Sequence, residues 1–388
     1  MTATDLFGYC EELTEAERDK LALLRAFLDE HARPFLAQWW EAAECPEHLR
    51  VGLAGLRLDD DPALLDDTGR LRPLYVGFRG LELARCDLSV SVLYAGQVSM
   101  FRTLVREGGS PEQVAELDPR IPTFEYTGCF ALTEPDHGSD VAGGMETQAR
   151  REGDGWRITG RKRWIGNAAI SDVIGVVAVD ESGDAKVFLV PRDAPGVSVQ
   201  DISGKISLRM VRNGDITLDD VVVSERQRLQ RIDSFRDIAD ILAFLRPDAA
   251  WTATGTQIGA YESALAYAQR RRQFGRPIAG FQLVQEKLAR MLGNATASLA
   301  MVVGLTNARE QGRGGDAESA LTKAWISDAL RETVALGREI GGGEGIRVEH
   351  DLARYFADAE AIYTFEGTRE INSLIVGRAI TGLSAFTR

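Results

Sequence analysis

One carboxyl group near the end of the chain has the surroundings of a general base. Glu366 lies in the segment YTFEGTREI, after Tyr363 and Phe365 and before Gly367. An apolar, aromatic setting disfavours the charged form of a carboxyl group, so it raises the pKa toward the range where a base works near neutral pH. The alternative is a glutamate in solvent, which is the commoner state of this residue type.

A turn rich in hydroxyl and carboxyl groups follows a short apolar run in GCFALTEPDHGSD, residues 128–140. Thr133 and Ser139 supply hydroxyls, and Gly138 makes the chain flexible between them. Such a turn can offer backbone N–H groups and hydroxyls to the polar edge of a ligand. An ordinary surface turn has the same composition and remains the alternative.

A tryptophan lies among β-type residues in GRKRWIGNAAISD, residues 160–172. Trp164 follows two cationic residues and precedes Gly166, so its indole ring could cover one face of a flat aromatic cofactor. Packing in a core is the alternative for this residue.

Two further segments could hold phosphate groups. RRRQFGRPIAGFQLVQEKLARM, residues 270–291, places three arginines near a break between helices, where guanidinium groups can form forked hydrogen bonds with phosphate. A solvated helix end explains Arg270 and Arg272 equally well, but it explains Arg271 beside Phe274 less well. REIGGGEGI, residues 338–346, is glycine-rich, which allows a close backbone approach but is also typical of a helix break.

Three regions of different texture must position these residues. Apolar residues recur at helical spacing up to residue 127, and residues 81–101 are expected to be helical. Short β-type runs broken by Gly, Pro, Asn and Asp fill residues 128–234. From residue 235 to residue 388 the helical period returns, with Gly-rich breaks that predict an antiparallel bundle. Arg246 is placed just before the helix that leads to Arg271.

Composition excludes several classes of protein. The 388 residues carry 45 Lys and Arg against 58 Asp and Glu, a net charge of −13, with no basic block that would suit nucleic acid. No uninterrupted apolar run reaches the ~18–20 residues of a membrane span, and the polar start is unlike a secretion signal, so we expect a cytoplasmic protein. The four cysteines and four histidines form no metal-ligand cluster, so we predict no metal and reduced, buried thiols.

The motifs in their order resemble those of the acyl-CoA dehydrogenase family of flavoproteins. TEPxxGSD, KRWIGN, RxQFGxPIxxFQxxQxKLARM, GGxGI and FEGTREI follow one another, and the resemblance runs from about residue 10 to the C-terminus. The texture is most like the glutaryl-CoA dehydrogenases and the short-chain acyl-CoA oxidases. The resemblance implies a mainly α fold with an inserted β domain. Its parts would be an N-terminal helical domain (1–127), a middle β-barrel or sandwich (128–234) and a C-terminal antiparallel four-helix bundle (235–388).

The same resemblance implies roles for individual residues. Glu366 matches the catalytic base, and Ser139, Arg246 and Gly367 match positions at the substrate. FAD would be held across a subunit interface, with Thr133 near the flavin pyrimidine edge and Trp164 beside the isoalloxazine ring. The implied FAD residues are Phe130, Leu132, Thr133, Gly138, Ser139, Trp164, Ile165, Gly166, Arg271, Phe274, Gln282, Gly342, Gly343, Thr368, Glu370 and Phe386.

The implied reaction is α,β-dehydrogenation of a short-chain acyl thioester, carried by CoA or by acyl carrier protein. Glu366 would remove the α-proton, and the β-hydride would go to flavin N5. Family members are dimers or dimers of dimers, so a homodimer or homotetramer is expected, with an electron-transferring flavoprotein as the electron acceptor. The rival hypotheses are an oxygen-using acyl-CoA oxidase or flavin-dependent N-hydroxylase, and a non-catalytic scaffold.

Three positions depart from the family pattern. Gly166 replaces a threonine whose hydroxyl bonds flavin N5, which leaves the oxygen reactivity of the flavin open. Ser91 stands where the glutaryl enzymes carry an arginine for the distal carboxylate, which favours a neutral acyl group. Glu344 replaces the usual asparagine of the GGNG element.

Overall fold

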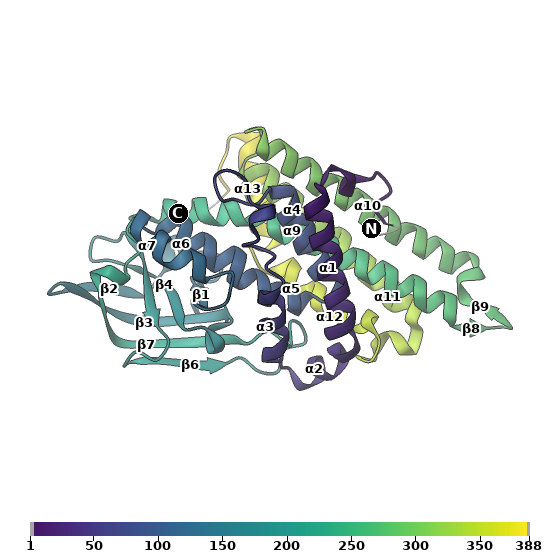
Figure 1. Ribbon diagram of the computed structural model, residues 1–388, viewed down its shortest axis with the longest axis horizontal. Helices are drawn as coiled ribbons and strands as arrows, with labels where there is room; N and C mark the ends of the chain where they lie inside the picture. The colour runs from purple at the N-terminus through teal and green to yellow at the C-terminus, as the bar shows by residue number, and fades with distance from the viewer. Residues whose placement is uncertain (1–3, 386–388) are drawn as a thin grey trace.

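The first region of the protein is helical. The structure is a computed structural model that describes residues 4–385 (Figure 1). Its first elements are η1 (Tyr9–Glu12), α1 (Glu15–His31), η2 (Arg33–Phe35), α2 (Leu36–Ala42), α3 (Glu47–Gly55), η3 (Pro62–Leu64), α4 (Pro73–Cys86), α5 (Leu88–Ala95), the π-helical η4 (Gly96–Phe101), α6 (Arg102–Gly108), α7 (Pro111–Leu117) and η5 (Asp118–Arg120).

Residues 81–101 are helical as expected, with one break at Asp87 between α4 and α5. The chain leaves α4 at Asp87, which has an extended backbone, and its carboxylate accepts hydrogen bonds from the N–H groups of Ser89 and Val90. An aspartate that caps N–H groups in this way starts a new helix. The apolar periodicity continues across the break, so it could not reveal the change of direction.

A curled mixed sheet follows. The elements are β1 (Gly128–Ala131), α8 (Val141–Gly144), β2 (Gln148–Glu152), β3 (Gly155–Gly166), η6 (Ala168–Ile170), β4 (Val173–Val179), β5 (Ala185–Pro191), β6 (Val197–Asp201), β7 (Asn213–Ser224) and η7 (Glu225–Gln227). The seven strands have the order β1-β4-β2-β3-β7-β6, with β5 also paired to β4, and β1 runs parallel to β4. The sheet has its own core, which includes Trp156, Ile158 and Phe188. A second core, with Phe101, Leu104 and Val187, joins the sheet to the helices.

Long helices form the third region. The elements are α9 (Phe235–Arg270), β8 (Arg272–Gln273), β9 (Arg276–Pro277), η8 (Ile278–Gly280), α10 (Gln282–Glu310), α11 (Asp316–Gly341), η9 (Gly342–Ile346), α12 (Asp351–Thr364) and α13 (Arg369–Thr381). Helices α9, α10 and α11 lie side by side as the predicted bundle, and α12 packs against α9 and α11 (Figure 1). A Cβ at Gly255 would lie 2.3 Å from the carbonyl oxygen of Leu81, so this glycine lets α9 approach α4 closely.

Arg246 lies inside α9 and not before it, which corrects the predicted helix start. The helix continues through Pro247, which lacks the N–H that would bond the carbonyl of Ala243. The guanidinium of Arg309 on α10 donates to that carbonyl at 3.2 Å. A side chain from 66 residues away in the sequence therefore satisfies the group that the proline leaves open.

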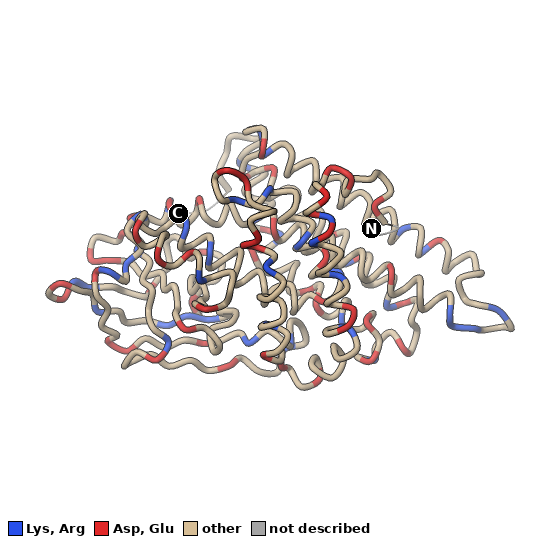
Figure 2. Tube along the Cα trace, viewed as in Figure 1, with Lys and Arg blue, Asp and Glu red and all other residues tan. Residues whose placement is uncertain are grey.

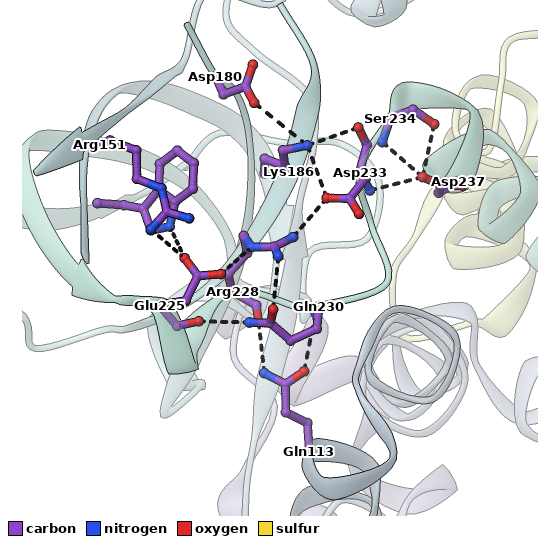
Figure 3. A network of polar contacts seen from close by, with 11 residues as sticks. Gln113, Arg151, Asp180, Lys186, Glu225, Arg228, Gln230, Asp233, Ser234 and Asp237 are labelled. Carbon is purple, nitrogen blue, oxygen red and sulfur yellow. Dashed lines mark hydrogen bonds and ion pairs between the residues drawn. The ribbon is translucent and has the colours of Figure 1, made fainter. Parts of the chain in front are cut away.

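A polar network fixes the passage from the sheet to the bundle (Figure 3). Lys186 on β5 bonds both the carbonyl and the carboxylate of Asp233, and Arg228 bonds the same carboxylate and that of Glu225. Gln113 on α7 donates to the carbonyls of Arg226 and Arg228. The network ties the N-terminal helices, the sheet and the start of α9 into one joint.

Two helical stretches have the length and hydropathy of a membrane span, Leu88–Gly108 and Gln282–Glu310. Their apolar windows are 72% and 44% buried inside the protein, and the buried core helix of a protein in water meets the same two criteria. Among the cysteines, Cys86 and Cys129 are buried as predicted, whereas Cys10 and Cys45 are only half-buried. Within residues 4–385 no group of three His, Cys, Asp or Glu is placed to hold a metal ion.

Candidate active site

Glu366 stands in the short turn between α12 and α13. Its side chain is half-buried, and its carboxylate accepts no hydrogen bond from residues 4–385. Burial raises the pKa of Glu366, Arg246 and Lys323 oppose the rise through their positive charges, and Asp248 adds to it. The surroundings therefore hold an unpaired carboxyl group with a raised pKa, as a general base requires.

The positive charge that faces Glu366 from α9 is Arg246. Its side chain is 11% exposed, it forms an ion pair with Asp316 at the start of α11, and its Nε has no hydrogen-bond partner in the described chain. Burial lowers the pKa of Arg246, and the negative charge of Glu366 opposes that change. A buried guanidinium with unused donors beside a carboxylate suits an anionic or carbonyl-bearing ligand.

Sequence reasoning missed three residues at this place: Asp248, Lys323 and Asn372. Burial raises the pKa of Asp248, which hydrogen-bonds Ser99 of η4. Lys323 and Asn372 bond the main chain around Glu366, and both are buried. The only signal for Asp248 and Lys323 in the sequence was a charge inside an apolar helical run, as in RPDAAW and LTKAWIS.

One buried ion pair, between Lys162 and Glu134, stabilises the TEPDHGSD turn after β1. Lys162 on β3 donates to the carbonyl of Leu132 at 3.0 Å and to Glu134 at 2.8 Å. Glu134 also accepts the N–H groups of Glu146 and Thr147. The hydroxyls of Thr133 and Ser139 make no hydrogen bond with any described residue, so both are available to a ligand. Phe130 is buried, Leu132 is half-buried and Gly138 is exposed, and a Cβ at Gly138 would meet nothing within 4 Å.

Trp164 lies beside this turn, because the N–H of Arg163 donates to the carbonyl of Thr133 at 2.8 Å. Its side chain is 51% exposed, which rules out the alternative that Trp164 is an ordinary core residue. Ile165 is buried, and a Cβ at Gly166 would find its nearest neighbours at 3.8 Å. An exposed indole above open space fits a planar ring system such as the isoalloxazine of FAD.

The helix from Leu88 to Phe101 touches both halves of the site. Asn167, next to Gly166, donates to the carbonyl of Leu93 at 3.0 Å. Six residues further along the chain, Ser99 bonds Asp248, whose charge acts on Glu366. The structure thus brings the Trp164 segment and the Glu366 turn to the same helical segment.

A third group of predicted residues lies far from these two. Arg271 caps the end of α9, Phe274 is 92% exposed in the β8–β9 hairpin, and Gln282 begins α10. Gly342 and Gly343 follow α11, and a Cβ on either would meet nothing within 4 Å. The hairpin lies at the opposite end of the molecule from the sheet (Figure 1), and Lys and Arg are concentrated there (Figure 2). One chain therefore does not bring this group to its own Trp164.

The remaining predicted residues lie at the start of α13 or beyond it. Thr368 caps the helix by accepting the N–H of Ile371 at 3.3 Å, and Glu370 is exposed in the first turn. Gly367 has a φ of 79°, which a glycine adopts without strain. Phe386 lies outside the described residues.

These groups fit FAD on the chemistry that they leave unused. The hydroxyls of Thr133 and Ser139 have no partner in the described chain, and the backbone at Gly342 and Gly343 is open. The Trp164 indole is half-exposed beside the Arg163 guanidinium, and the largely exposed Phe274 contacts only the edge of the Phe281 ring among the printed ring contacts of residues 4–385. Arg271 forms no ion pair within residues 4–385, although most arginines of this acidic protein do. The fold and the site define a flavin-dependent oxidoreductase.

Comparison with known proteins agrees with this class. The family model described as acyl-CoA dehydrogenase, middle domain, matches residues 129–221, and the C-terminal domain model matches residues 235–381. A probable acyl-CoA dehydrogenase of Bacillus subtilis, named YngJ, is 31% identical over 77% of this chain and 80% of its own length.

Two solved structures of glutaryl-CoA dehydrogenase from Mycobacterium smegmatis have the same fold. One is 34% identical with a TM-score of 0.91 and covers 99% of both chains. The other, in complex with FADH2, is 30% identical with a TM-score of 0.93 and covers 100% of both chains. The chain belongs to the acyl-CoA dehydrogenase family and is an FAD-dependent acyl-CoA dehydrogenase.

Proposed function

We propose that this enzyme oxidises a short-chain acyl thioester to the trans-2-enoyl thioester, with Glu366 as the base that removes the α-proton. The observation that carries the proposal is the half-buried, unpaired Glu366 carboxylate with a raised pKa. The α-proton of a thioester is a weak acid, so its acceptor must be both desolvated and still ionised in a useful pH range.

The residues around Glu366 supply these two conditions. Burial disfavours the ionised carboxylate, whereas Arg246 and Lys323 keep it accessible through their charges. The N–H of Glu366 itself is the donor that we assign to the thioester carbonyl, which polarises the α-carbon. When bound, FAD supplies the acceptor for the hydride of the β-carbon. Trp164, Thr133 and Ser139 would hold the isoalloxazine ring and the thioester, and so supply the orientation that the transfer requires.

The residues at and around Ser91 favour a short, neutral acyl group. Ser91 is buried, and its hydroxyl has no hydrogen-bond partner in the described chain. The buried arginines in this region, Arg79 and Arg102, are paired with Asp59 and Asp118 respectively. Arg85, buried on α4, is paired with Glu82 and Glu262. None of these three arginines of the described chain is thus free for a distal carboxylate, which favours a monoacyl group over glutaryl.

The far position of Arg271, Phe274, Gln282, Gly342 and Gly343 supports assembly. We assign them to the pyrophosphate and adenosine of an FAD whose flavin lies on a second copy of the chain, so the active unit is at least a homodimer. An electron-transferring flavoprotein is the proposed acceptor of the electrons. The thiol carrier is CoA or acyl carrier protein.

A second function is favoured by one residue. Gly166 has no hydroxyl to hold flavin N5, and this difference favours an enzyme that reacts with oxygen, either an acyl-CoA oxidase or an N-hydroxylase relative. The raised pKa of Glu366 supports the dehydrogenase or oxidase over the hydroxylase, because hydroxylation needs no α-proton base.

Flavin bleaching tests these proposals together. Purified holoenzyme is mixed without oxygen with butyryl-CoA, hexanoyl-CoA, glutaryl-CoA and butyryl-acyl carrier protein, and loss of flavin absorbance is followed. Bleaching by butyryl-CoA with formation of the enoyl thioester supports the proposal, and bleaching by glutaryl-CoA alone contradicts the neutral-acyl assignment. Rapid return of colour in air with release of peroxide would favour the oxidase.

A further inference from the structure

The turn that carries Glu366 has an unusual backbone. Glu366 has a φ of 54° and Gly367 a φ of 79°, so two successive residues lie in the left-handed region. For a residue with a Cβ this conformation costs ~1–2 kcal/mol. Such a conformation persists only when surrounding contacts hold it in place.

Lys323 provides the first of these contacts. It lies on α11 with 1% of its surface exposed, and its ammonium group donates to the carbonyl of Gly367 at 2.9 Å and to that of Tyr363 at 3.3 Å. These two carbonyls lie on either side of Glu366 in the sequence. One side chain therefore ties the last turn of α12 to the residue that follows the base.

Asn372 provides the second contact from the first turns of α13. It is fully buried, and its Nδ2 donates to the carbonyl of Gly367 at 2.8 Å and to that of Thr368 at 3.0 Å. The Gly367 carbonyl thus accepts hydrogen bonds from two buried side chains on two helices. A Cβ at Gly367 would lie 3.2 Å from the same Nδ2, so the close approach also requires glycine there.

Packing does not explain a lysine at this position. Burial lowers the pKa of Lys323 to about 8, with the charge of Glu366 opposing the change, and Lys323 forms no ion pair within residues 4–385. An ammonium group taken out of water without a carboxylate partner is costly, and methionine would fill the space without that cost. We therefore expect that the positive charge or the hydrogen-bond donors of Lys323 have a functional role.

We propose that Lys323 and Asn372 are positioning residues that hold the turn of the catalytic base through the Gly367 carbonyl. Together they fix where the Glu366 carboxylate and its N–H group lie relative to the substrate. Lys323 also sets the charge that the base faces. The inference rests on the proposed role of Glu366.

The charged groups around Glu366 make the second part of this role measurable. Arg246 and Asp248 face it from α9, Lys323 from α11, and Glu370 of α13 acts on Lys323. Removal of the Lys323 charge leaves Arg246 as the only cation among these groups. The pKa of Glu366 should then rise, which moves the acid limb of the pH dependence of kcat/KM to higher pH.

The experiment compares three variants of the holoenzyme by anaerobic flavin reduction with butyryl-CoA across pH. Lys323→Met removes donor and charge, Lys323→Arg keeps both, and Asn372→Leu removes a donor but no charge. Lys186→Met is the matched control, since it removes a buried lysine that bonds Asp233 at the distant joint. FAD content and circular dichroism are recorded for each variant.

The expected result separates position from charge. Lys323→Met should lower the reduction rate by ~100-fold, as a base displaced by about 1 Å would, and should move the acid limb upward by about 1 pH unit. Asn372→Leu should lower the rate by at least ~10-fold without moving the limb, because its contact is not ionic. Lys323→Arg should recover part of the rate, and Lys186→Met should leave rate and limb unchanged.

Other results would overturn the proposal. If Lys323→Met and Asn372→Leu keep their FAD and the wild-type rate, the turn does not depend on these residues. If Lys323→Met does not fold, an unchanged rate in Asn372→Leu is enough to reject the positioning role of the two residues. Glu366→Gln, measured beside them, keeps the two proposals apart. Full activity in Glu366→Gln rejects Glu366 as the base. Loss of activity in Glu366→Gln together with an unchanged rate in Lys323→Met rejects only the positioning role of Lys323.

Discussion

Removal of one partner of the Lys162–Glu134 ion pair should lower the free energy of unfolding strongly. The two side chains are 0% and 3% exposed, and the ammonium and carboxylate groups lie 2.8 Å apart. In Lys162→Met the carboxylate keeps two backbone N–H donors but loses the only cation that pairs with it within residues 4–385. Removal of one partner of a buried pair costs ~3–5 kcal/mol, because the remaining charge stays buried and uncompensated.

Urea denaturation of the FAD-loaded enzyme at pH 7 measures this cost. This pH is chosen because burial lowers the pKa of Lys162 to about 8, so the ammonium is still charged. The double variant Lys162→Met/Glu134→Gln should be more stable than Lys162→Met alone, since the amide needs no counterion. The exposed pair of Lys287 and Glu339 gives the control: Lys287→Met should cost less than ~1 kcal/mol.

Loss of the Lys162 contacts should also weaken FAD binding. Glu134 and Leu132 flank Thr133, so release of the turn should also raise the Kd for FAD, which is measured by flavin fluorescence. A loss below ~1 kcal/mol for Lys162→Met, or a double variant less stable than the single one, would refute the reasoning.

Three further predictions follow from particular contacts. Gly77→Ala should lower the free energy of unfolding by ~1–3 kcal/mol, because its Cβ would lie 2.1 Å from the Trp251 ring. Gly80→Ala on the same helix meets nothing within 4 Å and should be neutral or stabilising. Equal effects of the two changes in thermal melts would show that the Trp251 contact is unimportant. Burial and the neighbouring Asp87 raise the pKa of Asp358 to about 8, so the native state keeps a proton that the unfolded state releases above about pH 4. That difference makes stability fall as pH rises from about 4 toward 8, so Asp358→Asn should gain most at the upper end, and a constant difference in urea midpoints across pH would contradict the assignment. Arg271→Ala should leave the fold intact but lower the FAD content and the share of dimer in sedimentation; full flavin content would argue against a role in holding FAD.

Much of the architecture could be predicted from the sequence because its three textures are long and distinct. The alternation of β-type runs with turn residues in residues 128–234 has a different period from the helices on either side, and the structure shows a sheet there. The Gly-rich breaks predicted in GRPIAG, EQGRGGD and GGGEG do separate the helices of the bundle.

The errors arose where a distant residue decides a local structure. Arg246 was expected just before a helix, but α9 includes it and continues through Pro247, because Arg309 satisfies the Ala243 carbonyl. Lys323 and Asn372 could not be assigned to the Glu366 turn from the sequence, because the α11 contact spans 44 residues and no spacing rule relates them.

The central claim is that Glu366 removes the α-proton, and the rate of anaerobic flavin reduction in Glu366→Gln tests it most directly. The change keeps the size of the side chain and removes its basicity. The variant is expected to bind FAD and butyryl-CoA but to reduce its flavin more slowly by orders of magnitude at every pH. A variant that retains FAD and is reduced at the wild-type rate would contradict the account.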